Sequence, residues 1–214
     1  EIYRDTLAQA APAEVAARTR ELLSALAEFH ACGVKPEQRL NRGHMIEQSK
    51  TAAAQLAWLC PRWHSDAEKL AAEIAAVPIL LATAPAHGDM KPEHIVFARG
   101  KTVLLDLDSF VEADPLYDLA MLDVRIAILA SAGTCSRTAA GVASGLVGEA
   151  AVARYGRDAA RRFEWLKACA ALQVAKHHAQ NPRPDSPRLV ATALKSGAQI
   201  LAGARQSSIL QETA

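Results

Sequence analysis

The sequence is poor in aromatic residues, and its cysteines are few and far apart. Aromatic side chains make up 5 % of the 214 residues, and the cysteines are Cys32, Cys60, Cys135 and Cys169. No C-x-x-C spacing occurs, so neither a zinc motif of that kind nor a disulfide framework is indicated. We therefore expect reduced, buried thiols and a cytoplasmic protein.

The sequence also lacks a long apolar run and an excess of charge of one sign. A membrane-spanning helix needs about 20 consecutive apolar residues. The longest candidate, residues 71–86, is interrupted by Glu73, Pro78 and Pro85, and no basic segment followed by an apolar stretch opens the chain. The formal net charge is +1. We therefore expect neither a membrane nor a nucleic-acid partner.

Apolar residues are abundant and follow helical spacing over most of the chain. Half of the residues are apolar and 22 % are charged, which is typical of a globular protein. Alanine, the best helix former, is frequent. Apolar periodicity and breaks at glycine and proline predict helices over 13–31, 44–60, 65–77, 116–131, 136–155, 157–180 and 187–204. Ser65 and Glu68 have the spacing of a capping box for the third of these helices.

One segment in the middle of the chain has a different texture. Residues 95–97 and 102–105 are short β-like runs separated by Arg99-Gly100-Lys101. Two such runs joined by a tight turn predict a β-hairpin. The fold class is therefore mostly α (α+β), a helical body with one small hairpin.

Polar residues gather at the two ends of this predicted hairpin. Asp89 and His94 precede the first strand, and Asp106 and Asp108 follow the second. A hairpin places its two ends side by side, so Asp89, His94 and Asp106 should converge. Phosphoryl transfer needs such a pair of carboxylates, because one orients the attacking hydroxyl and the other holds the metal that bridges the phosphates. Gly88 would let the backbone turn beside Asp89 without a Cβ clash.

Three segments in order, residues 87–94, 104–108 and 113–120, resemble the signature of the aminoglycoside phosphotransferase-like enzymes. These enzymes are small-molecule relatives of the protein kinases. The resemblance implies a protein-kinase-like fold with the hairpin at its active site. It also implies transfer of the γ-phosphate of ATP or GTP to a hydroxyl of a small molecule. Mg²⁺ is the expected cofactor, with Mn²⁺ as the substitute.

The resemblance also assigns roles to individual residues. Asp89 matches the catalytic aspartate and Asp106 the metal-binding aspartate, while Asp108 is a candidate second metal ligand. His87, placed with Asp89 in the catalytic group, matches a residue that braces the loop. Asp118 matches an aspartate that tethers the following helix to this loop.

The sequence departs from the family pattern at one ligand position. His94 stands where most members carry an asparagine that binds a second magnesium ion, although the macrolide phosphotransferases are similar in having histidine there. Imidazole suits softer metals than magnesium. His94 is predicted to be a metal ligand; the alternative is a histidine that hydrogen-bonds Asp106 without touching metal.

The family's amino-terminal lobe, which clamps the nucleotide, has no counterpart in this sequence. No strand-rich segment precedes residue 13, so no phosphate-covering loop and no nucleotide-binding residue can be assigned. Residues 1–12 would lie just past the hinge between the lobes. We therefore expect residues 1–214 to form a carboxy-terminal lobe alone, with the missing lobe as its partner and little activity by itself.

Two other classes of function remain open at this point. A kinase-like module that binds a partner or nucleotide without transferring phosphate would fit the missing lobe and His94. A zinc hydrolase would also use histidine and aspartate, but the further ligands that a catalytic zinc needs at short spacing are not found near Asp89.

Several other residues have a structural interpretation. His177 and His178 point about 100° apart on a helix, so we expect two surface residues. Trp58, Trp63 and Trp165 are expected to pack in the core or between helices.

Arg183 and Arg188 lie in a proline-rich loop, expected to be a solvated linker, with binding of an anionic substrate as the alternative. Residues 183–205 are basic, which is unfavourable for a cationic aminoglycoside.

Overall fold

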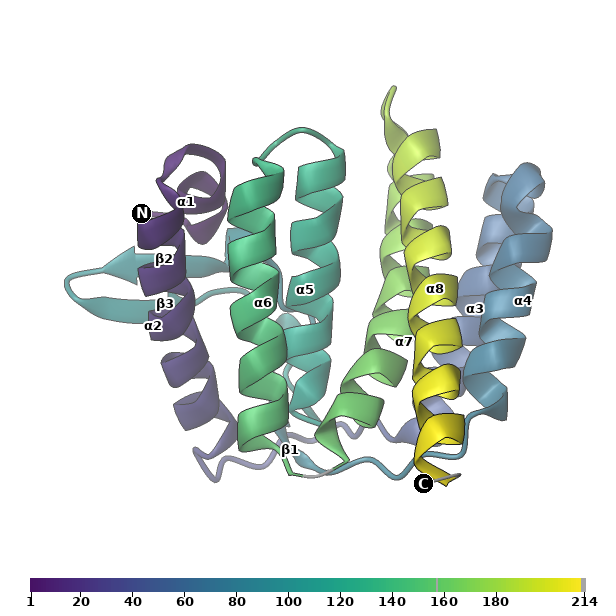
Figure 1. Ribbon diagram of the computed structural model, residues 1–214, viewed down its shortest axis with the longest axis horizontal. Coiled ribbons are helices and arrows are strands. Elements are labelled where there is room, and N and C mark those ends of the chain that lie inside the picture. The colour runs from purple at the N-terminus through teal and green to yellow at the C-terminus, as the bar shows by residue number, and fades with distance from the viewer. Residues whose placement is uncertain (157, 213–214) are drawn as a thin grey trace.

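The computed structural model describes residues 1–156 and 158–212, with the side chains of residues 204–212 left undescribed. Eight α-helices occur in this part of the chain, and Figure 1 shows most of them standing side by side. Their bounds are α1 Tyr3–Gln9, α2 Pro12–His30, α3 Arg42–Leu59, α4 His64–Ala76, α5 Leu116–Ser131, α6 Arg137–Arg154, α7 Ala159–Gln180 and α8 Ser186–Glu212.

Helix α7 is the centre of the body, packing against α3, α4, α5, α6 and α8. Its alanines let neighbouring helices approach closely, and Ala168, Ala170 and Ala171 are fully buried. Trp165 supplies the largest buried side chain of α7 and donates from Nε1 to the carbonyl oxygen of Ile74 in α4 at 3.0 Å. The alanine-rich composition therefore builds a closely packed helical core.

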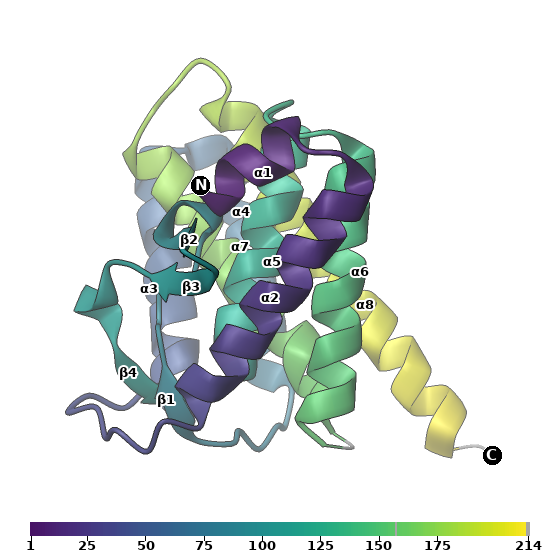
Figure 2. The same ribbon diagram turned by 90° about the vertical axis from the view of Figure 1, so that its left-hand side faces the viewer.

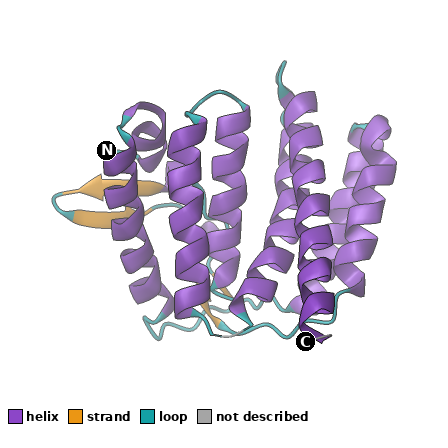
Figure 3. Cartoon of the chain, viewed as in Figure 1, coloured by secondary structure: helices purple, strands orange, loops and turns teal. Residues whose placement is uncertain are grey.

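The strands form two small antiparallel pairs (Figure 3). Strands β2 (Ile95–Ala98) and β3 (Lys101–Leu104) are the predicted hairpin, which projects from the helical body. Its turn is Arg99-Gly100, with φ of 51° and 70°. Positive φ at both turn positions is the geometry that matches the twist of a two-residue hairpin.

The second pair is β1 (Ala84–Ala86) with β4 (Val111–Ala113), which lie together in Figure 2. The sequence analysis did not predict this pair, because three-residue strands that contain alanine and proline carry little β signal. The pairing matters for the site, since β1 leads directly into His87 and β4 into Asp114.

The seven predicted helices are all present, and their ends agree within two residues except for α8, which continues to Glu212. The predicted start at residue 157 lies outside the described residues. Helix α1 was not predicted as a helix.

The capping-box prediction at Ser65 was wrong. Helix α4 begins at His64, directly after the 3₁₀ turn Pro61–Trp63, and no side chain caps it. The capping box occurs instead at α3, where Asn41 Oδ1 accepts from the backbone N–H of His44 at 3.0 Å.

Two expectations about burial also need correction. All four cysteines are free, but only Cys135 and Cys169 are buried; Cys32 is exposed. Trp58 is 81 % exposed and so is not a packing residue. Among the described residues, no helix combines the length and the apolar character needed to cross a bilayer.

The contrast between Trp165 and Trp58 gives a test of the core. Trp165→Ala should lower the free energy of unfolding by about 3–5 kcal/mol, because it leaves a large cavity and an unpaired carbonyl at Ile74. Trp58→Ala, the matched control, should change it by about 0.5 kcal/mol or less. Urea denaturation of the two variants measures both values. Equal losses would contradict the placement of these two tryptophans.

Candidate active site

The loop that carries Asp89 begins where β1 ends and is shaped by Gly88. Gly88 has φ of 83°, and a Cβ at this position would clash with the backbone carbonyl oxygen of Ser109. Only glycine can therefore combine the left-handed backbone with this close approach. The loop lies directly against residues 107–109, the 3₁₀ turn that follows Asp106. This agrees with the role expected for Gly88 from the sequence.

A buried carboxylate holds this loop in place. Asp118, in the first turn of α5, is fully buried and accepts hydrogen bonds from the backbone N–H groups of His87 at 2.8 Å and Gly88 at 2.9 Å. Its Oδ2 also accepts from Nε2 of His30 at 2.9 Å, and Nδ1 of His30 contacts the hydroxyl of Tyr155 at 2.8 Å. Asp118 therefore joins α2 and α5 to the loop, the tether that the resemblance implied.

Asp114 performs a similar task at the end of β4. It is fully buried and accepts from the backbone N–H groups of Ala82 at 2.9 Å and Leu116 at 3.0 Å, with Arg162 at 3.4 Å. Burial raises the pKa of Asp114 against the opposing effect of these hydrogen bonds and of Arg162. The two buried aspartates thus fix both ends of the β1–β4 pair to α5.

His87 holds the backbone on both sides of the site in place. Its Nε2 donates to the carbonyl oxygen of Leu105 at 2.8 Å, and its Nδ1 accepts from the backbone N–H of Asp89 at 3.4 Å. A carbonyl can only accept, so this pattern assigns the neutral imidazole with its proton on Nε2. The ring is fully buried and stacks on that of His94. His87 therefore positions Asp89 and the segment before Asp106, and in this position it cannot touch a substrate itself.

Asp89 is half-buried and surrounded by cations. Its Oδ2 accepts from Nζ of Lys91 at 2.9 Å, and its Oδ1 lies 3.6 Å from a guanidinium nitrogen of Arg125 in α5. Burial acts to raise the pKa of Asp89, but the hydrogen bond from Lys91 and the charges of Lys91 and Arg125 outweigh it, so the pKa lies below its usual value. Asp89 is therefore ionised at neutral pH and can accept a hydrogen bond from a hydroxyl.

Asp106 lies across the hairpin from this loop, next to His94. Its backbone is in the left-handed region, with φ of 60°, which is uncommon for a residue other than glycine. Oδ2 of Asp106 lies 3.0 Å from Nε2 of His94, while Nδ1 of His94 is buried and without a partner. Burial, followed by the charge of Lys91, lowers the pKa of His94. Its imidazole is therefore neutral at pH 7.

Asp106 and His94 are the candidate ligands for a magnesium ion. Asp106 is exposed, and its Oδ1 has no hydrogen-bond partner among the described residues. Magnesium keeps several waters and needs only one or two protein ligands besides phosphate oxygens. Asp106 therefore fits such an ion, and His94 would join it as a ligand if Nε2 turned from Asp106 to the metal, where a nitrogen ligand suits Mn²⁺ better than Mg²⁺.

Asp108 lies elsewhere in the site. It lines a groove of about 920 Å³ together with Asp89, Gly88, Tyr117 and Arg125. In the part of the chain that the structure describes, no group of three or more His, Cys, Asp or Glu side chains could hold a metal ion. The three-ligand set of Asp106, His94 and Asp108 is therefore not assembled, and a zinc hydrolase finds no ligand set in the same residues.

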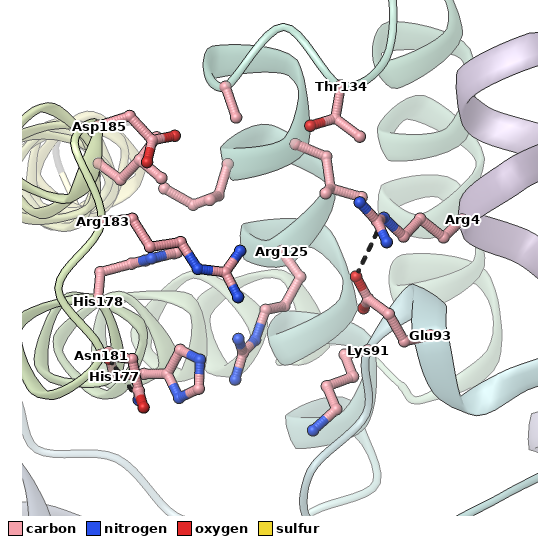
Figure 4. Close-up of a pocket in the computed structure, with 14 residues that line it drawn as sticks. Arg4, Lys91, Glu93, Arg125, Thr134, His177, His178, Asn181, Arg183 and Asp185 are labelled. Carbon is pink, nitrogen blue, oxygen red and sulfur yellow. Dashed lines mark hydrogen bonds and ion pairs between the residues drawn. The ribbon is translucent and has the colours of Figure 1, made fainter.

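A second, smaller cavity of about 360 Å³ lies on the other side of Lys91 and Arg125 (Figure 4). His177, His178 and Arg183 line it, although these histidines were predicted to be separate surface residues. The cavity is bordered by Asn181, Arg183 and Asp185 of the segment that follows α7, and of the two histidines His177 is exposed, as predicted. Residues 181–184 are exposed, as expected for a solvated linker, and Arg183 among them also lines this cavity.

The sequence analysis did not single out Lys91 or Arg125. A signal existed for Arg125: the otherwise apolar helix α5 carries only three charged residues, Asp118, Asp123 and Arg125. Each has a partner at the active site or in the core, since Asp123 lies 3.1 Å from Nζ of Lys167. A charged residue inside an otherwise apolar helix therefore indicates a specific partner, and this signal could have pointed to Arg125.

Comparisons with known proteins agree with this arrangement. A family model described as "Phosphotransferase enzyme family" matches residues 1–126, which is more than half of the chain. A comparison with curated protein sequences found no match.

Three solved structures illustrate the fold. A candidate aminoglycoside phosphotransferase from Ralstonia eutropha JMP134 has a TM-score of 0.64 at 14 % identity, covering 94 % of this chain and 68 % of its own. A choline/ethanolamine kinase family protein from Mesorhizobium loti has 0.59 at 20 % identity, covering 92 % and 70 %. The choline kinase LicA from Streptococcus pneumoniae has 0.57 at 12 % identity, covering 90 % and 66 %, and LicA has also been solved with AMP.

These similarities show the kinase-like fold that the sequence analysis predicted. The chain spans about two thirds of the length of these structures. Their low identities carry no statement about the substrate of this chain.

The tether at Asp118 can be tested through stability. Asp118→Ala leaves His30 and two loop amides without their acceptor, so it should lower the free energy of unfolding by about 3–5 kcal/mol. Glu149→Ala removes an exposed carboxylate from α6 and should change it by about 0.5 kcal/mol or less. Chemical denaturation compares the two. An unchanged stability of Asp118→Ala would contradict the tether.

Proposed function

The chain belongs to the phosphotransferase enzyme family, and we propose that it is the carboxy-terminal lobe of a small-molecule kinase. The complete enzyme would move the γ-phosphate of ATP or GTP to a hydroxyl group of its acceptor. The proposal rests on the presence of two carboxylates in different surroundings. Asp89 is ionised and lines the groove, and Asp106 is exposed and lies beside His94. Two carboxylates with separate surroundings can take the two roles that phosphoryl transfer requires.

Asp89 would orient the acceptor hydroxyl and receive its hydrogen bond. Its carboxylate is ionised, half-buried and open to the groove, and His87 and Asp118 hold its loop through the backbone. Lys91 and Arg125 would supply positive charge near the transferring phosphoryl group, where negative charge is spread over the equatorial oxygens. Fixed positions and charge neutralisation supply most of the rate enhancement in such reactions.

Asp106 and His94 would hold a magnesium ion, which would supply positive charge for the nucleotide phosphates. The left-handed backbone at Asp106 directs this residue across the hairpin to His94, and His87 stacks beneath. Nε2 of His94 orients the Asp106 carboxylate through its contact at 3.0 Å, and the same nitrogen would have to leave this contact to bind a metal.

An uncovered apolar strip supports the assignment to a carboxy-terminal lobe. Val103, Leu105 and Leu107 follow one another at every second position along β3 and the segment after it, and each is more than 40 % exposed. Ile2, which bridges to β2, is also exposed. An amino-terminal lobe and the nucleotide would cover this strip, as the length of the matched structures suggests.

The role of Asp89 is tested in the complete enzyme, with the amino-terminal lobe supplied. Asp89→Asn should lower kcat by about 10²–10⁴-fold and leave KM for the nucleotide nearly unchanged. Glu149→Gln makes the same change of charge at a distant exposed position and should leave kcat unchanged. Steady-state measurement of nucleotide consumption provides both constants.

Retention of kcat within a few-fold in Asp89→Asn would contradict this role. A complete protein that binds nucleotide but phosphorylates no alcohol would instead be a non-catalytic kinase-like module. The 214-residue chain alone should show little turnover, because no residue in it has been assigned to clamp the triphosphate.

The role of His94 is tested by metal binding, independently of turnover. His94→Asn should weaken binding of Mn²⁺ more than binding of Mg²⁺, because imidazole favours first-row transition ions over magnesium. Asp106→Asn should weaken binding of both. Electron paramagnetic resonance follows free Mn²⁺, and competition with Mg²⁺ yields the second affinity. Identical Mn²⁺ and Mg²⁺ affinities in wild type and His94→Asn would leave His94 as a hydrogen-bonding partner of Asp106.

A further inference from the structure

The smaller cavity beside Asp89 is lined by an excess of positive charge. Four cationic side chains, Arg4, Lys91, Arg125 and Arg183, line it with two carboxylates, Glu93 and Asp185. Arg4 is paired with Glu93 at 3.5 Å. Lys91 and Arg125 share the single carboxylate of Asp89, at 2.9 and 3.6 Å, so the cationic side chains around the cavity outnumber the carboxylates.

Arg125 and Arg183 approach this space from opposite walls. Figure 4 shows both guanidinium groups reaching into the cavity, one from α5 and the other from the segment that follows α7. Among the described residues, the guanidinium of Arg183 has no hydrogen-bond or ion-pair partner. Nε of Arg125 is buried without a partner, and its nearest carboxylate is that of Asp89 at 3.6 Å. A buried N–H group without a partner is costly, so Nε of Arg125 lacks an acceptor that a ligand can supply, whereas Arg183 is exposed and its guanidinium is free to bind the same ligand.

The two histidines of the cavity experience the same positive surroundings. Burial, then the charges of Arg125 and Lys91, lowers the pKa of His177. Burial, His177 and Arg125 lower the pKa of His178 to about 4, and Nε2 of His178 is buried without a partner. Both rings are neutral at pH 7 and have nitrogen atoms available for a ligand.

The cavity is also placed to serve the reaction. Lys91 and Arg125 line it and contact Asp89 at the same time, so a molecule held there lies next to the carboxylate. Its volume of about 360 Å³ is in the range of small-molecule sites. The guanidinium groups of Arg125 and Arg183 suit a carboxylate or phosphate group, because a guanidinium can bind such a group with two N–H donors.

We propose that this cavity binds an anionic group, a phosphate or carboxylate, of the acceptor alcohol. Arg183 and Arg125 hold the anion, and the hydroxyl of the same molecule reaches Asp89. The identification of the bound molecule as the acceptor rests on the proposed function. The anion site itself does not depend on it. A cationic alcohol is disfavoured, since it would meet Arg125, Arg183 and Lys91 with like charge.

The test measures binding to the 214-residue chain by isothermal titration calorimetry. The probes are glycerol 3-phosphate and inorganic phosphate as anions, glycerol as a neutral alcohol and choline as a cationic one. Both anions should bind, glycerol and choline should not, and added salt should weaken the binding.

Variants assign the binding to the cavity. Arg183→Gln should weaken binding of glycerol 3-phosphate by about tenfold or more, the loss expected for hydrogen bonds to a charged group. Arg161→Gln is the matched control: it removes an exposed arginine from the other end of α7, about 24 Å along the helix from His177. It should leave the affinity unchanged.

Three results would overturn the inference. They are the absence of anion binding that depends on Arg183, equal binding of choline, and displacement of glycerol 3-phosphate by ADP, which would assign the anion site to the nucleotide. In the complete enzyme, phosphorylation of neutral or cationic alcohols but not anionic ones would reject the anionic acceptor and leave the proposed function standing. Binding through Arg183 without phosphorylation of any alcohol would reject the proposed function and leave the anion site standing.

Discussion

The buried carboxylate of Asp118 is the contact on which the geometry of this site depends. It is ionic, excluded from water, and satisfied only by two backbone N–H groups of the loop and one imidazole from α2. Such a group is stable only while all its partners stay in place, since an unpaired buried charge is costly. The loop conformation, the start of α5 and the position of α2 are therefore coupled. Asp89 lies in this loop, so the same contacts fix its position.

Gly88 and His87 also fix the loop conformation, through contacts with the segment around Asp106. The loop can pass against Ser109 only because residue 88 has no Cβ, and the ring of His87 then connects Asp89 to Leu105. The loop and the segment around Asp106 are thus held together by backbone contacts. A side chain placed through its backbone is held more precisely than one placed by surface contacts alone, which suits a site that works by positioning.

The electrostatics of the site follow from helices that bring charge into an apolar body. Arg125 comes from α5, the two histidines from α7, and Arg183 from the turn that leads to α8. Arg125 and Arg183, together with Lys91, create a positive potential beside Asp89, and the two neutral histidines lie with them in the cavity. If the cavity binds the acceptor as proposed, its positive charge would disfavour a cationic alcohol.

The sequence by itself determined the helical body, the hairpin and the roles open to Asp89, Asp106 and Asp118, because these depend on local periodicity, turn chemistry and a contiguous motif. It did not reveal the β1–β4 pair, whose short strands are stabilised by pairing across the fold and by Asp114. Nor did it place Trp58 in solvent or His177, His178 and Arg183 in one cavity, and it left Asp108 among the metal ligands. Those positions arise where α5, α7 and residues 181–185 meet, and a contact between distant segments leaves no periodic trace in either one. Tertiary structure alone therefore decided the charge of the cavity beside Asp89.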